Sequence, residues 1–351
     1  MKKLRVLVVE DSLTVRKRIC EILSEDPEIE VVAEAADGRQ AIDLCQRLLP
    51  DVISMDIMLP VMTGVAATEY IMAHCPTPIL VVSSSYNRGE VYRTFDALSA
   101  GAVDVLDKAH YDEPDGVWEQ KLISAIKMVS RIKVITHPRG LSPQESSPPA
   151  AISSPGEPGQ RLSALAIGAS TGGPAALVNV LTTLPLDVTV PILVVVHISE
   201  PFANAFADWL DGVSPRRVRY ATEGERLDAI NGCVVMAPPD RHLVVGEGQR
   251  LRLTMDPARH SCRPSVDVLF ESVARQLGSA AAACLLTGMG RDGAAGLLEV
   301  RRAGGFTIAQ DEASSVVYGM PREAVLLGAA EKVLHLTRIG PTLGALAKGR
   351  R

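Results

Sequence analysis

A serine near the middle of the chain lies in a glycine-rich segment, Gly168-Ala169-Ser170-Thr171-Gly172. An apolar run precedes this segment and a helical pattern follows it, which predicts a strand, a tight turn and a helix. The turn would hold the serine beside the free backbone N–H groups of a helix N-terminus, where it can act as a nucleophile. The same geometry could cradle phosphate, or carry no chemistry. Serine stands, however, where the dinucleotide-binding pattern requires a second glycine.

Two residues that could assist a nucleophile follow predicted strands in the same half of the chain. His197 ends the apolar run 191–197, and Asp292 lies in a glycine-flanked loop after the run 280–286. If they share one rim of a sheet with Ser170, the histidine can remove the serine proton and the aspartate can orient the imidazole. A packed histidine and an aspartate that caps the next helix are the structural alternatives.

The loop before Asp292 could aim a backbone N–H at a developing oxyanion, because Gly288 and Met289 lie there. The spacing leaves His242 and His260 open as alternative bases. His260 and Cys262 lie two positions apart in the sequence, and we do not expect them to form a zinc site.

A second group of polar residues marks the ends of predicted strands in the first half of the chain. These residues are Glu10, Asp11, Asp56, Ser83 and Lys108. The carboxyl ends of parallel strands meet at one edge of a sheet, so these groups should converge. Three crowded carboxylates repel one another, and oxygen ligands with open water positions suit Mg²⁺. The sequence therefore predicts a magnesium site, although any one of these residues could simply be a solvated surface charge.

The elements that must position these residues alternate along the chain. In the first half, predicted strands at 4–9, 31–35, 52–55, 79–82 and 103–106 alternate with predicted helices at 14–24, 39–49, 65–74, 90–99 and 117–132. Five such units predict a five-stranded parallel sheet of the flavodoxin-like kind, with helices on both faces.

The second half repeats this α/β character. Strands are predicted at 162–167, 191–197, 232–237, 243–245, 251–254, 280–286 and 307–310, and helices at 175–181, 265–277 and 294–303. The two strands between 243 and 254 suggest a hairpin. The whole pattern predicts a doubly wound, mostly parallel sheet.

The composition is that of a soluble globular protein with two domains. The chain has 351 residues, of which 47% are hydrophobic and 22% charged, and a formal net charge of −5. Proline, serine and glycine dominate residues 137–160, so we expect domains at 1–130 and 161–351 and a linker at 131–160. The near-neutral second half disfavours nucleic acid as a partner. No apolar run approaches the ~20 residues of a membrane span, and no signal-peptide pattern begins the chain, so we expect a cytoplasmic protein without membrane insertion.

Residues 1 to about 130 resemble the receiver domain of bacterial response regulators. The resemblance implies that Asp56 is the phospho-acceptor, with Mg²⁺ held by Glu10, Asp11, Asp56 and the carbonyl of Met58. A sensor histidine kinase would be the phosphodonor.

The same resemblance implies that Ser83 binds a phosphoryl oxygen and that Lys108 pairs with the phosphoryl group. Two residues depart from the receiver pattern. Ala109 stands where proline is usual, and Val105 stands where many receivers carry an aromatic switch residue.

Residues from about 162 to 335 resemble the catalytic domain of the protein-glutamate methylesterases of bacterial chemotaxis. The resemblance rests on the segments 167–173, 263–270, 286–293 and 310–322 and on the strand that ends in His197. It implies that Ser170 is the nucleophile, His197 the base and Asp292 the orienting acid. Thr171 and Met289 would line the site, and Ala237-Pro238-Pro239-Asp240 replaces a more usual glycine-rich turn.

The resemblance also implies an activity. Such an enzyme removes methyl groups from glutamyl methyl esters on methyl-accepting chemotaxis receptors, can deamidate receptor glutamines, and needs no cofactor for the esterase reaction. We expect the receiver to inhibit the esterase until Asp56 is phosphorylated. A receiver with an output domain that only binds a nucleotide or a protein is the alternative.

Overall fold

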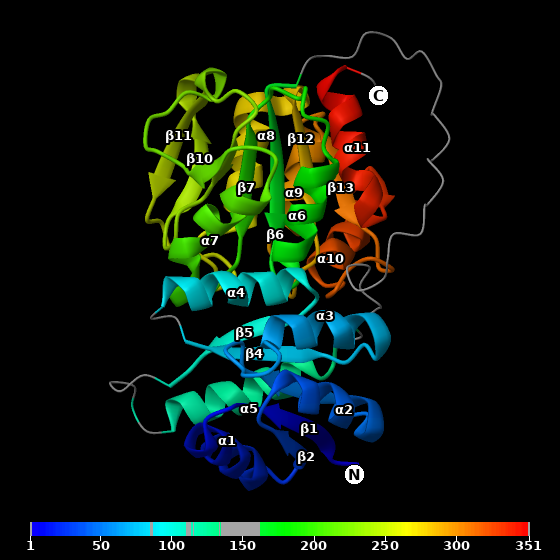
Figure 1. Cartoon of the computed structure of the whole chain (residues 1–351). Coiled ribbons are helices and arrows are strands. Elements are labelled where there is room, and N and C mark those ends of the chain that lie inside the picture. Colours follow the sequence, from blue (N-terminus) through cyan, green and yellow to red (C-terminus); the bar gives the residue numbers. More distant parts are fainter. Residues whose placement is uncertain are drawn as a thin grey trace. The chain divides into compact units, whose positions relative to one another are not determined.

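The computed structural model describes residues 2–84, 87–109, 114, 116–132, 134 and 162–349. The chain divides into two compact units, Met1–Ser147 and Pro148–Arg351 (Figure 1). Nearly all of the linker predicted at 131–160 lies outside the described residues. None of the helices within the described residues combines the length and apolar character that a membrane span needs.

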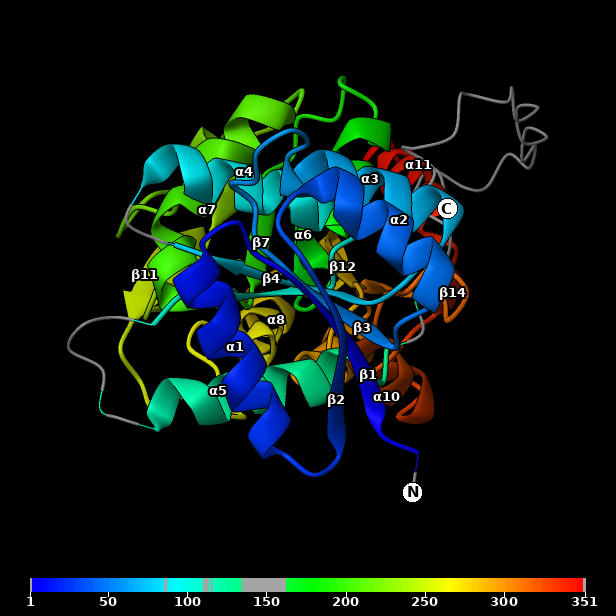
Figure 2. The ribbon, with the colours of Figure 1, turned by 60° about the horizontal axis from the view of Figure 1, so that its bottom comes forward.

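The first unit contains five parallel strands in the order β2-β1-β3-β4-β5. The strands are β1 (Leu4–Val9), β2 (Ile29–Ala35), β3 (Val52–Met55), β4 (Ile79–Ser83) and β5 (Asp104–Asp107). The helices are α1 (Leu13–Glu25), α2 (Gly38–Leu48), α3 (Gly64–His74), α4 (Arg88–Ser99) and α5 (Val117–Val129). Helices α1 and α5 lie on one face of the sheet, and α2, α3 and α4 lie on the other (Figure 2). The predicted five-stranded flavodoxin-like sheet is confirmed.

Side-chain caps set where helices of this unit begin. Ser12 accepts a hydrogen bond from the backbone N–H of Val15, and Asp37 accepts one from Gln40. Each cap satisfies a donor that the helix itself leaves unpaired, and its loss costs about 1 kcal/mol. The cap at Ser12 also fixes the short loop after β1, which carries Glu10 and Asp11.

The second unit contains a seven-stranded parallel sheet in the order β14-β13-β12-β6-β7-β9-β8. The strands are β6 (Ala164–Ala169), β7 (Ile192–Val196), β8 (Val218–Tyr220), β9 (Val234–Met236), β12 (Ala281–Leu285), β13 (Phe306–Gln310) and β14 (Lys332–Leu334). A separate antiparallel hairpin joins β10 (His242–Gly246) to β11 (Arg250–Thr254), as predicted. The short edge strands β8 and β14 were not predicted.

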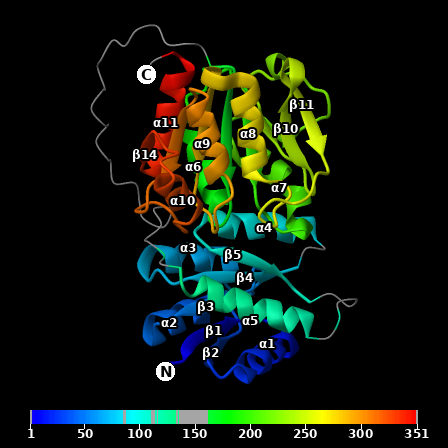
Figure 3. The same ribbon diagram turned by 180° about the vertical axis from the view of Figure 1, so that it is seen from behind.

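Helices cover both faces of this sheet, so the predicted doubly wound architecture is confirmed. They are α6 (Gly173–Thr183), α7 (Glu200–Val213), α8 (Val266–Leu277), α9 (Ala294–Arg302), α10 (Met320–Leu326) and α11 (Leu336–Ala347). Helices α6 and α11 pack together on one face, whereas α8 and α9 pack together on the other (Figures 1 and 3).

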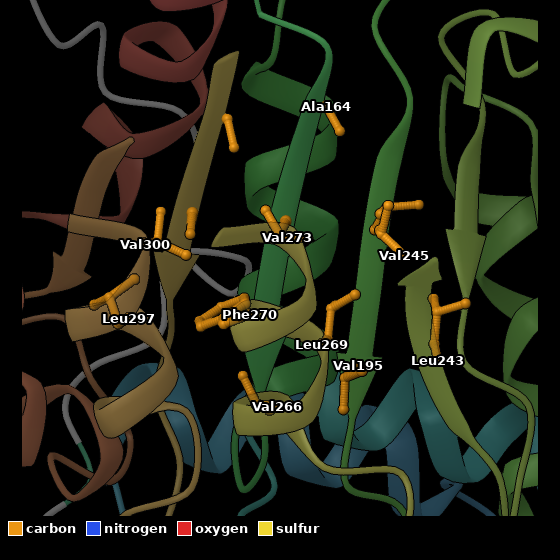
Figure 4. Close-up of a cluster of buried hydrophobic side chains, with 14 of the residues drawn as sticks. Ala164, Val195, Leu243, Val245, Val266, Leu269, Phe270, Val273, Leu297 and Val300 are labelled. Carbon is orange, nitrogen blue, oxygen red and sulfur yellow. The ribbon is translucent and has the colours of Figure 1, made fainter. Parts of the chain in front are cut away.

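A continuous apolar cluster joins α8 and α9 to the sheet (Figure 4). Helix α8 contributes Val266, Leu269, Phe270 and Val273, a spacing that places all four on one helical face. Phe270 is fully buried, and burial of such a side chain contributes roughly 1.5–3 kcal/mol. This packing fixes the N-terminus of α8 close to β6, because a Cβ added at Gly168 would collide with the side chain of Val266.

Candidate active site and phospho-acceptor site

The predicted nucleophile lies where the order of strands in the second sheet changes direction. Strand β6 is central, with β7 on one side and β12 on the other. Ligands of open parallel sheets bind at such a switch point, beyond the carboxyl ends of the strands. Ser170 directly follows β6, and the loop with Asp292 follows β12.

The register between β6 and β7 brings Ser170 and His197 side by side. Ala169 of β6 pairs with Val196 of β7, so the next residue on each strand is one of the predicted pair. The backbone N–H of His197 donates to the carbonyl of Ala169 at 3.1 Å, and that of Ser170 donates to Thr287 at 3.0 Å. Backbone pairing, rather than a flexible loop, therefore sets both positions.

His197 and Asp292 form a direct hydrogen bond. Nε2 of His197 lies 2.9 Å from Oδ2 of Asp292, and the aspartate is almost fully buried. The structure thus brings together two residues that are 95 positions apart in sequence. The imidazole nitrogen that remains to face a substrate or a nucleophile is Nδ1.

Asp292 is held by further donors at the N-terminus of α8. Its oxygens accept hydrogen bonds from the Ser265 hydroxyl at 2.7 Å, the Val266 N–H at 2.7 Å and the Asp267 N–H at 3.1 Å. Burial alone would raise the pKa of Asp292, but the hydrogen bonds from His197, Ser265 and Asp267 outweigh it and lower that pKa. The helix N-terminus favours the same charged form. Asp292 is therefore a fixed anion.

The pKa of His197 is raised, whereas that of Asp292 is lowered. Burial would lower it, but the hydrogen bond and charge of Asp292, together with Cys262, raise the pKa of His197 from 6.5 to about 9. The aspartate thus stabilises the imidazolium form. This is the state that a histidine base reaches after it has taken a proton from a hydroxyl.

The other two candidate bases have structural roles. His242 is fully buried, and its Nδ1 accepts a hydrogen bond from the N–H of Ser265 at 3.1 Å. His260 lies 3.2 Å from Asp267 on α8. Only His197 follows a strand next to Ser170.

The loop after β12 holds Gly288 through both of its backbone polar groups. The N–H of Gly288 donates to the carbonyl of Val317 at 3.0 Å, and its carbonyl accepts from Met320 at 2.8 Å. The N–H of Gly288 is therefore already engaged in this structure, and the oxyanion role predicted for this loop stays a prediction. Its lack of a side chain lets the loop approach the nucleophile, because an added Cβ would lie 2.7 Å from Cβ of Ser170. Sequence spacing could not show this, since Val317 and Met320 come from a distant segment.

Met289 and Thr171, the two other predicted lining residues, lie next to this contact. Met289 directly follows Gly288 and its side chain is 54% exposed. The carbonyl of Thr171 accepts a hydrogen bond from the Thr287 hydroxyl at 3.0 Å, which joins the loops after β6 and β12. A substrate-lining role for the two residues stays a prediction.

Cys262 is a neighbour of the site that the sequence did not predict. Its Sγ lies 3.8 Å from Nδ1 of His197. His260 is the histidine nearest to Cys262 in the sequence, yet the histidine that its thiol faces is His197, 65 positions away. Only the strand register and the loop before α8 bring them together.

In the first unit, the predicted carboxylates converge at the ends of β1 and β3. Ligand oxygens of Glu10, Asp11 and Asp56 lie within 4.8 Å of one another. Lys108 Nζ lies 3.0 Å from Glu10 and 3.2 Å from Asp56. Glu10 and Asp56 are both almost fully buried.

The charge of this cluster is not balanced by Lys108 alone. Burial and then the charge of Asp56 raise the pKa of Glu10 to about 6, although Lys108 opposes both effects. Burial likewise raises the pKa of Asp56, against the lowering effect of Lys108. A second cation would relieve this excess of negative charge. Carboxylate oxygens at this spacing fit a hard ion such as Mg²⁺.

Met58 and Ser83 lie at the edges of this cluster. The backbone of Met58 hydrogen-bonds the carboxylate of Asp56, and its side chain is 43% exposed. Ser83 is fully buried, and its hydroxyl donates to Glu90 at 3.1 Å and accepts from Thr94 at 2.9 Å. In this structure the Ser83 hydroxyl therefore faces α4, and it must exchange a partner to bind a phosphoryl oxygen.

Together the two sites define a class of protein. A domain with a cluster of buried carboxylates is followed by an α/β domain with a serine, a histidine and an aspartate at one rim of its sheet. Comparison with known families agrees with this. The family described as CheB methylesterase matches residues 165–343, and the response regulator receiver domain matches residues 6–114. The chain belongs to the CheB methylesterase family and carries a receiver domain in front of the methylesterase domain.

Relatives match along nearly the whole chain. A protein-glutamate methylesterase/protein-glutamine glutaminase of Nitrosospira multiformis is 44% identical over 99% of this chain and 98% of its own length. One from Anaeromyxobacter dehalogenans is 42% identical with the same coverage. The crystal structure of the Thermotoga maritima CheB methylesterase catalytic domain is 34% identical, has a TM-score of 0.50, and covers 53% of this chain and all of its own.

Proposed function

We propose that this chain hydrolyses γ-glutamyl methyl esters on methyl-accepting chemotaxis receptors, with release of methanol and restoration of glutamate. The observation that carries the proposal is the hydrogen bond between His197 and Asp292. His197 lies one residue beyond the β6–β7 pairing that also positions Ser170. The names of the relatives, which include both esterase and glutaminase, supply the substrate class.

The chemistry follows from the roles that the geometry allows. Ser170 Oγ attacks the ester carbonyl while Nδ1 of His197 takes its proton, and Asp292 stabilises the resulting imidazolium through Nε2. The tetrahedral intermediate collapses as the imidazolium returns the proton to the departing methanol. Water then attacks the acyl-enzyme by the same route and releases the glutamate side chain. General-base assistance of this kind contributes about 10²–10⁴-fold in rate.

An oxyanion donor is needed for both tetrahedral intermediates. Because the N–H of Gly288 is engaged by Val317, the backbone N–H of Met289 is the donor that we assign, with Thr171 lining the same side. One such donor contributes about 3 kcal/mol. Deamidation of a receptor glutamine uses the same steps, with ammonia as the leaving group.

We further propose that a chemotaxis sensor histidine kinase phosphorylates Asp56. Glu10, Asp11, Asp56 and the carbonyl of Met58 would hold Mg²⁺, which neutralises charge on the phosphoryl group. The carboxylate of Asp56 is the nucleophile, Lys108 pairs with the phosphoryl oxygens, and Ser83 binds one of them after it leaves Glu90. Phosphorylation adds up to about two negative charges, and we propose that it relieves inhibition by the receiver.

Methanol release from a methylated receptor tests this proposal. The full chain should release methanol, and a small phosphodonor with Mg²⁺ should raise the rate. A shortened chain that begins near Ser153 should be more active than the unphosphorylated full chain. If the full chain releases no methanol with or without phosphodonor, the output domain binds rather than hydrolyses. Equal rates from the three preparations would instead refute the inhibitory role of the receiver.

A further inference from the structure

Cys262 is presented to the active site by a tightly closed turn. Arg259 and Cys262 exchange two backbone hydrogen bonds, of 3.0 and 2.8 Å, across His260 and Ser261. Both central residues have positive φ, 50° and 61°. A two-residue turn of this kind has little freedom, so the position of Cys262 is set by the backbone.

Two side-chain contacts tie this turn to α8. Arg259 Nη1 lies 2.7 Å from Glu271, and His260 Nε2 lies 3.2 Å from Asp267. Helix α8 is itself fixed by its buried apolar face, and its N-terminus holds Asp292. Helix α8 therefore fixes both the turn that carries Cys262 and Asp292, the aspartate that orients His197.

The thiol of Cys262 faces the nitrogen of His197 that the aspartate does not engage. Nε2 is bonded to Asp292 at 2.9 Å, while Nδ1 lies 3.8 Å from Sγ of Cys262. A tetrahedral zinc ion bound to nitrogen and sulfur at their usual distances separates the two ligand atoms by about 3.6 Å. The observed separation is thus close to the span that a single metal ion requires.

We propose that Nδ1 of His197 and Sγ of Cys262 form an inhibitory site for a borderline divalent cation such as Zn²⁺. Nitrogen and sulfur donors select such ions over Mg²⁺, which the carboxylates of the receiver suit instead. Asp292 serves as the outer partner that orients the metal-bound imidazole, and one of its oxygens lies within 4.8 Å of the ligand atoms of both other residues. Water completes the coordination.

Binding consumes the group that the esterase needs. The thiol loses its proton to solvent and donates its sulfur lone pair, and Nδ1 donates the lone pair that would otherwise accept the proton of Ser170. The inhibitory effect therefore rests on the proposed function of His197 as the base, whereas the binding itself does not.

The test uses the full chain with excess Mg²⁺, which occupies the receiver carboxylates. Co²⁺ replaces Zn²⁺ for the direct measurement, because a cobalt–thiolate bond gives a charge-transfer absorption. Wild type is compared with Cys262→Ser and with the control Cys233→Ser, which alters another partly exposed thiol of the same domain. Cys45 and Cys75 of the receiver share a hydrogen bond, and any absorption from them persists in all three proteins.

Wild type and Cys233→Ser should show a cobalt absorption that Cys262→Ser lacks. In methanol release, with each protein normalised to its own rate without metal, the Zn²⁺ concentration for half-inhibition should rise at least about 10-fold in Cys262→Ser. Equal absorption and equal inhibition in Cys262→Ser and Cys233→Ser would overturn the site. If the absorption depends on Cys262 but Ser170→Ala does not reduce methanol release, the metal site stands and the proposed role of the triad is refuted.

Discussion

The two sites occupy equivalent places in two similar sheets, yet different forces hold them. Each lies at the carboxyl ends of parallel strands, where the strand order changes direction. In the receiver, buried charges dominate, and Lys108 bridges Glu10 and Asp56. In the methylesterase domain, hydrogen bonds dominate, because His197, the Ser265 hydroxyl and two backbone N–H groups satisfy Asp292 before any substrate binds.

The pKa directions express the same contrast. Burial, as the largest cause, raises the pKa of both Glu10 and Asp56, so the receiver site gains by taking up positive charge. Hydrogen bonds from His197 and Ser265 and the charge of His197 overcome burial at Asp292 and lower its pKa, so this carboxylate is charged before substrate binds. The receiver carboxylates are thus short of positive charge, whereas Asp292 is already matched by its donors.

The largest predicted effect is at the acceptor. Asp56→Asn removes the carboxylate that we propose forms the acyl phosphate, so a small radiolabelled phosphodonor should label wild type and leave the variant unlabelled. Asp43→Asn, an exposed position on α2, is the matched control and should label normally. Comparable labelling of Asp56→Asn would place the acceptor elsewhere.

The next largest effect on activity is expected at Asp292. Asp292→Asn should lower kcat for methanol release by about 10³–10⁴-fold, because the amide cannot stabilise the imidazolium. In the double variant with Ser170→Ala there should be little further loss, since the residues act as a unit. Losses that multiply would show that the two residues work independently.

A smaller effect concerns the close approach at Gly288. In Gly288→Ala the new Cβ meets Cβ of Ser170 and the sulfur of Met320, and overpacking of this kind costs about 1–3 kcal/mol. Denaturant unfolding should show this loss. Gly212→Ala, where an added Cβ meets nothing within 4 Å, should be neutral or stabilising; similar stability of the two variants would refute the close approach.

The smallest predicted effect is on the pH profile. His197 must be unprotonated to accept the serine proton, and Asp292 and Cys262 raise its pKa to about 9. The value of kcat/KM should therefore rise with pH through neutrality towards that value. In Asp292→Asn this ascending limb should move to lower pH, because the raising interaction is lost. An unshifted limb would assign the ionisation to another group.

Periodicity predicted both sheets because apolar runs and helical stripes alternate in each half. Strand β3 was predicted at its observed bounds, and the predicted α5 extended three residues beyond Val129. The short edge strands β8 and β14 have three residues each, too few for a periodic signal. Helix α11 contains Pro341, and a proline within a helical pattern usually predicts that the helix ends there.

The positions of the site residues could be predicted for the same reason, since polar groups at strand ends converge in parallel sheets. The partner that each group engages could not be predicted from the sequence. Gly288 is held by Val317, Ser83 by Glu90, and His197 is faced by Cys262. These contacts depend on loop geometry between segments that are distant in sequence or on side-chain orientation, and neither leaves a periodic pattern.

The most direct test of the central claim is methanol release from a methylated chemotaxis receptor by Ser170→Ala, with Ser163→Ala, just before the opposite end of β6, as the control. Loss of one hydroxyl should leave the unfolding profile of both variants near that of wild type. We predict that Ser170→Ala loses at least about 10⁴-fold in kcat, while Ser163→Ala retains the wild-type rate. Turnover by Ser170→Ala within a few-fold of wild type would contradict the assignment of Ser170, His197 and Asp292 as one catalytic unit.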